Sequence, residues 1–153
     1  MPEQTATDYM ELAMAEARAA GARGEVPVGA VVVEAASGRV LARAGNETEA
    51  ATDPTAHAEV LAIRRATQVI GAPRLQDCDL YVTLEPCAMC AAAISHARLR
   101  RLYFGAYDPK GGGVEHGPRF FAQPTCHHAP EVIGGLRETE AAALLKAFFQ
   151  DKR

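Results

Sequence analysis

Apolar residues recur along the chain at two spacings, which predict four helices and four strands. Apolar side chains at helical spacing, such as Tyr9, Leu12, Ala13 and Ala17, indicate amphipathic helices. The predicted helices cover residues 8–20, 57–70, 87–96 and 139–150. Short apolar runs bounded by turn residues indicate buried strands. The predicted strands cover residues 26–34, 39–44, 79–84 and 102–106.

The order of these elements predicts a mixed β-sheet. Ser37-Gly38 is a turn signal between the first two strands and predicts an antiparallel hairpin. Strand, helix and strand then alternate, which favours parallel pairing in the second half of the sheet. We therefore expect a three-layer α/β/α sandwich in one domain, residues 1–153. The segment 107–130 contains several Gly and Pro residues without sustained periodicity, so we expect it to form an active-site wall or lid.

The composition is that of a globular protein that needs no disulfide bonds for stability. The chain has 153 residues, of which 48% are hydrophobic, and a chain of this size can bury a core without disulfides. Apolar runs such as 30–33 are too short to span a bilayer, and the first residues do not resemble a secretion signal. We expect a cytoplasmic protein without a membrane segment. Its four cysteines should then be reduced, with two on a metal and Cys78 buried.

The net charge of -3 excludes a broad basic field. A nucleic-acid substrate would therefore have to be held by a local basic strip. Candidates for such a strip are Arg98, Arg101 and Lys110, although single basic residues are more often simply solvated.

Candidate chemistry is concentrated in the stretch 83–90, where two thiols follow a proline. If Pro86 occupies the first helical position, Cys87 and Cys90 lie on one face of the first turn and reach one ion. The positive end of a helix also favours the thiolate that a metal requires. This pair alone fits either a redox dithiol or half of a zinc site.

His57 and Glu59 favour the zinc interpretation. One histidine and two cysteines make three ligands, and catalytic zinc sites keep the fourth position for water. Glu59 is then suited to take a proton from that water. Because side chains two positions apart diverge within a helix, both helices must point their N-termini at the metal. We predict one Zn²⁺ per chain; the alternative is a non-catalytic zinc module, which would have no use for Glu59.

A second metal site is not expected at Cys126-His127-His128. Adjacent side chains of an extended segment point to opposite sides, so these three cannot readily face one ion.

His-x-Glu followed by Pro-Cys-x-x-Cys is the signature of the zinc-dependent nucleoside and nucleobase deaminases. The flanking sequence resembles the bacterial tRNA-specific adenosine deaminases over nearly the whole chain. The matching blocks are Glu25–Ala30, Gly45–Asn46, Asp53–Glu59, Leu80–Cys87 and Asp108–Gly112.

This resemblance implies a five-stranded sheet and a homodimer that converts the wobble adenosine of a tRNA anticodon loop to inosine. It also implies that Asn46 hydrogen-bonds the nucleoside and that Asp108, with Lys110 nearby, lies beside the target nucleotide. From the residues alone, Asn46 and Asp108 could be turn residues. Glu85 is better suited to support the helix entry, or to hold neighbouring residues of the site, than to act as a second catalyst. Deamination of a free base, guanine or cytosine, is the alternative activity.

Overall fold

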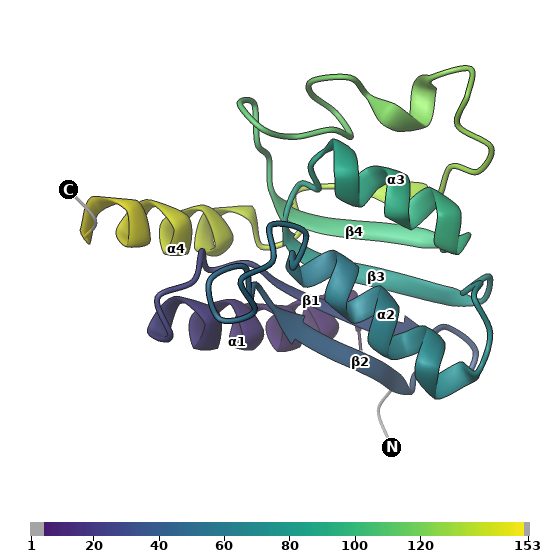
Figure 1. The fold of residues 1–153 in the computed structure, drawn as a ribbon, viewed down its shortest axis with the longest axis horizontal. Coiled ribbons are helices and arrows are strands. Elements are labelled where there is room, and N and C mark those ends of the chain that lie inside the picture. Colours follow the sequence, from purple (N-terminus) through teal and green to yellow (C-terminus); the bar gives the residue numbers. More distant parts are fainter. Residues whose placement is uncertain (1–4, 152–153) are drawn as a thin grey trace.

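The computed structural model describes residues 5–151, and within this range the chain forms four α-helices, five strands and a short 3-10 helix (Figure 1). The helices are α1 (Ala6–Ala22), α2 (Ala58–Ile70), α3 (Ala88–Ala97), α4 (Glu138–Asp151) and the 3-10 helix η1 (Phe120–Ala122). The strands are β1 (Gly29–Glu34), β2 (Val40–Gly45), β3 (Cys78–Leu84), β4 (Arg101–Ala106) and β5 (Glu131–Ile133).

The five strands form one mixed sheet in the order β2-β1-β3-β4-β5. β1 pairs antiparallel with β2 and β3, so the predicted hairpin is confirmed. β3 and β4 pair in parallel through the crossover helix α3, and β5 adds to β4 in parallel. The pattern of apolar residues did not predict β5, because a strand of three residues is too short to show an alternation.

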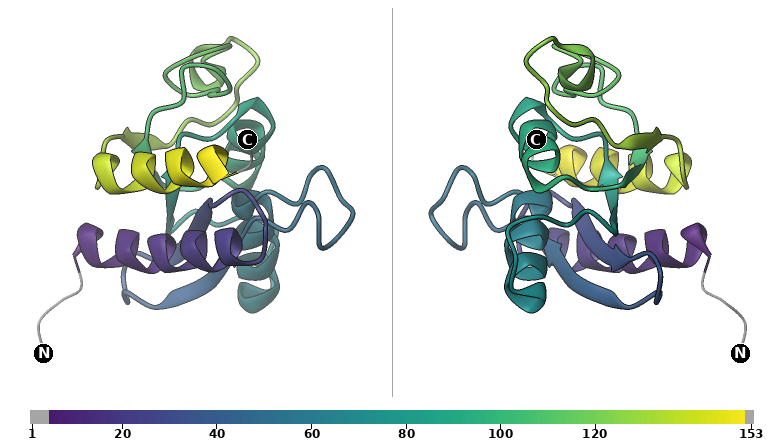
Figure 2. Two further views of the ribbon diagram at one scale, coloured as in Figure 1. Left: turned by 90° about the vertical axis from the view of Figure 1, so that its left-hand side faces the viewer. Right: turned by 90° about the vertical axis from the view of Figure 1, so that its right-hand side faces the viewer.

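Helices cover both faces of the sheet, which confirms the predicted α/β/α sandwich (Figure 2). α1 and α4 lie on one face, over a core that includes Met10, Met14 and Tyr81. α2 and α3 lie on the other face, where Ala62 and Ile94 are fully buried. None of the helices in the described part of the chain is long and apolar enough to cross a membrane.

Local sequence explains where the helices begin and end. Thr5 and Asp8 form a capping box that starts α1, two residues before the predicted start. Gly71 ends α2 in the left-handed region, with φ 77°, where a residue without a Cβ is unstrained. The segment 107–130 is irregular, as predicted, apart from η1, and Figure 1 shows it crossing beside α3.

Candidate metal and catalytic site

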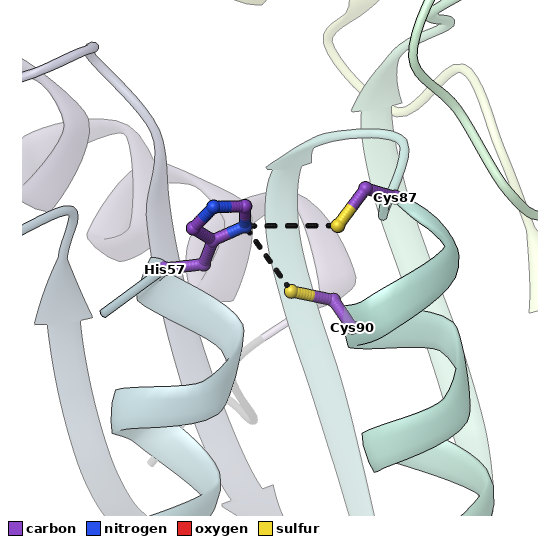
Figure 3. Close-up of side chains that lie close together, drawn as sticks. All are labelled: His57, Cys87 and Cys90. Carbon is purple, nitrogen blue, oxygen red and sulfur yellow. Dashed lines mark hydrogen bonds between the residues drawn. The ribbon is translucent and has the colours of Figure 1, made fainter. Parts of the chain in front are cut away.

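The N-termini of α2 and α3 meet at one end of the sheet and bring three candidate ligands together (Figure 3). His57 is the N-cap of α2 and Cys87 is the N-cap of α3. Nδ1 of His57 lies 3.6 Å from Sγ of Cys87 and 3.5 Å from Sγ of Cys90. The ligand atoms of all three residues lie within 4.8 Å of one another, so they could hold one metal ion. Both helices therefore point their N-termini at this cluster, as predicted.

Pro86 is not the first residue of α3, and the prediction for it is wrong. Cys87 precedes the helix in an extended conformation, with φ -70° and ψ 175°, and Pro86 lies one position further out. Cys87 and Cys90 thus occupy the cap and the third helical position, whose side chains approach each other as in a capping box. This places both sulfurs on the side of α3 that faces His57.

The distances within this cluster fit a zinc ion. In a tetrahedral site with zinc bonds of about 2.3 Å to sulfur and about 2.0–2.1 Å to nitrogen, a nitrogen and a sulfur lie about 3.6 Å apart. The two observed distances, 3.5 and 3.6 Å, agree with this value. One imidazole and two thiols are also a donor set that zinc prefers over magnesium or calcium.

The electrostatics of the cluster favour a thiolate. A hydrogen bond from Cys90, together with the neighbouring His57, overcomes burial and lowers the pKa of Cys87 to about 4. The same hydrogen bond, together with burial, raises the pKa of Cys90. The hydrogen bond to Cys87 raises the pKa of His57.

Glu59 lies in the first turn of α2, two residues after His57, with only 4% of its surface exposed. Its burial raises the pKa of the carboxyl to about 7. A carboxyl with a pKa in this range can both accept and release a proton near neutral pH, as a general acid–base catalyst must.

Three comparisons with known proteins identify the family. Residues 4–152 match the family model of the MafB19-like deaminases. The chain is 63% identical to the tRNA-specific adenosine deaminase of Agrobacterium fabrum, over 96% of this chain and 95% of that protein. The chain belongs to the deaminase family that includes the bacterial tRNA-specific adenosine deaminases. The predicted resemblance is confirmed.

Solved structures agree with this assignment. A structure from a study of A-to-I editing by tRNA:A34 deaminases at the wobble position superposes with a TM-score of 0.88 at 63% identity, covering 91% of this chain and 99% of that one. Guanine deaminase from Bacillus subtilis superposes with a TM-score of 0.67 at 32% identity, covering 84% of this chain and 83% of that one. The five-stranded mixed sheet is therefore the fold of the deaminase family.

Asn46 supports the start of α2 in this deaminase. Its Oδ1 accepts a hydrogen bond of 2.9 Å from the backbone N–H of Ala58, the first residue of the helix. His57 makes no side-chain capping bond itself, because its ring points at the thiols. The backbone carbonyl of Asn46 accepts a bond from Arg23. Asn46 is only 8% exposed, so it is a buried cap rather than a loop-tip residue.

Asp108 shapes a turn. Its Oδ1 accepts hydrogen bonds from the backbone N–H groups of Lys110 (3.2 Å) and Gly111 (2.9 Å). The turn belongs to residues 108–116, which follow β4 and pack beside the start of α3; we call this segment the 108–116 wall. The side chain of Lys110 is exposed. The substrate contacts of Asp108 and Lys110 remain predictions.

Two buried carboxylates hold the loops on either side of the site. Glu25 accepts bonds from the side chain of Thr48 and the backbone N–H groups of Glu49 and Ala50, and so fixes the loop that precedes α2. Glu85 does the same for the 108–116 wall. The sequence predicted no role for Glu25, and for Glu85 a role in supporting the helix entry or neighbouring site residues. The bonded loops could not be predicted, because they lie more than twenty residues away in the chain.

Cys78, Cys126, His127 and His128 lie outside the metal cluster. Cys78 is 1% exposed, as predicted. The thiol of Cys126 donates to the backbone carbonyl of His128, and Nε2 of His128 donates a bond of 2.6 Å to the carbonyl of Leu99. His127 is exposed. That this stretch holds no second metal stays a prediction.

Proposed function

We propose that this deaminase converts adenosine to inosine at the wobble position of tRNA. The observation that carries the proposal is the convergence of His57, Cys87 and Cys90 beside the buried Glu59. The 63% identity to a tRNA-specific adenosine deaminase supports tRNA as the substrate. Residues 1–153 then form a single deaminase domain.

His57, Cys87 and Cys90 hold one Zn²⁺ in this proposal. Their spacing and chemistry fit that ion, and three protein ligands leave a position for water. A zinc ion supplies a water molecule of lowered pKa, towards ~7, as the nucleophile.

Glu59 moves the protons. Its carboxylate takes a proton from the attacking water while the water oxygen bonds to the ring carbon that carries the amine. The carboxyl gives this proton to the ring nitrogen. It then takes the second proton, from the hydroxyl now on the ring carbon, and gives it to the amine as the carbon–nitrogen bond breaks, so that adenosine and water give inosine and ammonia. Burial suits the carboxyl to this double role, because it brings the pKa of Glu59 to about 7.

Asn46, Asp108 and Lys110 bind the substrate in this proposal. Asn46 lies at the start of α2 beside His57, where its side-chain N–H can reach a nucleoside. The turn of Asp108 places a carboxylate where it can accept a bond from a ribose 2′-hydroxyl, which DNA lacks. An anticodon loop suits such a site because its bases are already unpaired.

We infer that the enzyme works as a cytoplasmic homodimer. The outer face of α3 is rich in alanine, and Met89 at its start is 36% exposed, so this helix offers an apolar surface to a second copy. The cytoplasmic location follows from the proposed tRNA substrate, which the 63% identity to a tRNA-specific adenosine deaminase supports.

The test is a reaction of the purified protein with total tRNA, followed by sequencing for adenosine-to-inosine conversion. We expect conversion at the wobble position of tRNA with adenosine there, and none within helical stems. The Glu59→Ala variant is the control for contaminating activity.

Deamination of a free base is the second candidate, because guanine deaminase from Bacillus subtilis shares the fold at 32% identity. Ammonia release from guanine and cytosine separates the two activities. If the enzyme releases ammonia efficiently from a free base and leaves the anticodon loop unmodified, the free base and not tRNA is the substrate.

A further inference from the structure

Glu85 follows β3 immediately and precedes Cys87 by two positions, and its side chain is completely buried (0% exposed). Its Oε2 accepts hydrogen bonds from three successive backbone N–H groups, those of Val114 (3.2 Å), Glu115 (2.9 Å) and His116 (3.1 Å). One carboxylate oxygen therefore holds the far end of the 108–116 wall.

The other oxygen of Glu85 holds the near end of the same wall. Oε1 accepts a bond of 3.0 Å from the backbone N–H of Asp108 and one of 2.8 Å from Nδ1 of His116. The wall is therefore closed into a loop around one side chain. Asp108, which we place beside the substrate, is fixed at its backbone by this carboxylate.

The wall also rests directly on the metal-binding turn. The backbone N–H of Gly113 donates a bond of 2.7 Å to the carbonyl of Pro86. A Cβ on Gly113 would lie 2.6 Å from the nitrogen of Ala88 and 2.8 Å from the carbonyl carbon of Cys87. Such distances leave no room for a side chain, so the wall packs directly against the start of α3.

Only an ionised glutamate fits the five donors around Glu85. A carboxylate is purely an acceptor, whereas the amide of glutamine would present an N–H₂ group to N–H donors.

We propose that Glu85 is a positioning residue for the deamination reaction: it fixes the 108–116 wall, and with it Asp108 and Lys110, relative to the His57, Cys87 and Cys90 cluster. It acts through the wall and touches neither substrate nor metal. This inference rests on the proposed function, since it assigns the wall to substrate binding. Losing the anchor should therefore impair substrate binding and leave the metal in place.

The direct test is Glu85→Gln, compared with Glu138→Gln. Both variants remove one negative charge, but the side chain of Glu138 is exposed, in the first turn of α4, and lies outside the 108–116 wall. For Glu85→Gln we expect faster hydrogen exchange at the amides of residues 108 and 114–116 and unchanged zinc content. We expect kcat/KM on an anticodon stem-loop to fall on the order of 100-fold, mostly through KM, because a displacement of about 1 Å has an effect of that size. Glu138→Gln should match the unmodified enzyme.

His116 gives a milder test that leaves the four backbone bonds of Glu85 intact. His116→Ala removes the side-chain donor, whereas His116→Asn can place an N–H group near the position of Nδ1. We expect KM to rise about three- to ten-fold in His116→Ala, as for loss of a bond to a charged group, and to return to within about two-fold in His116→Asn. If Glu85→Gln does not fold, these two His116 variants test whether Glu85 positions the 108–116 wall.

Unchanged exchange and unchanged KM in Glu85→Gln would overturn the inference, as would equal KM values in the two His116 variants. The exchange measurement needs no substrate. If the unmodified enzyme fails to edit the stem-loop while the wall amides of Glu85→Gln exchange faster, the proposed function is wrong and the anchoring of the wall stands.

Discussion

Replacing Asn46 separates its structural role from its role in substrate binding. The side chain makes one capping bond, from the N–H of Ala58 to Oδ1. Loss of such a helix-capping bond costs about 1 kcal/mol, within a range of about 0.5–2 kcal/mol. The N–H of Ala58 is buried, so the upper half of that range applies to Asn46→Ala. For a chain of this length, about 1–2 kcal/mol lowers Tm by roughly 2–8 °C.

Asn46→Asp keeps the acceptor and removes the donor. A carboxylate can accept the bond from Ala58, and a negative charge is favourable at a helix N-terminus. We therefore expect the Tm of Asn46→Asp to lie above that of Asn46→Ala. Neither variant can donate to the nucleoside, so kcat/KM on an anticodon stem-loop should fall at least about ten-fold in both.

Thermal unfolding followed by circular dichroism and initial rates of inosine formation check these two effects separately. If Asn46→Ala unfolds at the same Tm as the unmodified enzyme, the capping argument is refuted. If the kcat/KM of Asn46→Asp equals that of the unmodified enzyme, the substrate contact of Asn46 is refuted.

Further predictions concern the metal, acid stability and RNA binding. Cys87→Ala should lose zinc by elemental analysis and unfold at a lower temperature, because bound zinc contributes folding free energy. Burial opposes ionisation of Glu25, but the hydrogen bonds to its carboxylate hold the pKa of Glu25 below the usual value. The ionised side chain therefore stabilises the fold above the ordinary pKa of ~4.3, and this stabilisation is lost as the pH falls below that value. Glu25→Gln should flatten the fall in Tm below about pH 4.3, and an unchanged acid profile would count against this role. Neutralising Arg98, Arg101 or Lys110 should raise KM with little change in kcat. The slope of log affinity against log salt concentration should fall by roughly one unit per lost phosphate contact. A slope equal to that of the unmodified enzyme would exclude the contact.

Each half of the metal cluster could be predicted from local sequence, and the deaminase signature connects the two halves, although His57 and Cys87 lie 30 residues apart in the chain. The spacing of Cys87 and Cys90 and the start of a helix after His57 are enough to place each ligand at a helix N-terminus. Only the position of Pro86 was wrong, by one residue, because the preference of proline for the first helical position is a tendency and Cys87 here remains extended as the cap.

The features that the sequence did not predict depend on contacts between distant residues. β5 exists only because three residues pair with β4, and so short a segment carries no periodic signal. Glu85 binds donors that lie 23 and 31 residues further along the chain, and no spacing rule connects them. The carbonyl of Asn46 is likewise held by Arg23, a neighbour only in the folded chain. Helix and strand patterns report local preference, whereas these roles arise from tertiary packing.

The most direct test of the proposed chemistry measures zinc content and inosine formation on one preparation of Glu59→Ala. Glu59 is buried beside the ligand cluster but is not one of the three residues that converge on the metal position. We predict about one zinc ion per chain in both the unmodified enzyme and the variant, and nearly complete loss of wobble inosine in the variant alone. Loss of zinc from Glu59→Ala, or inosine formation at the unmodified rate, would contradict the division between metal binding and proton transfer.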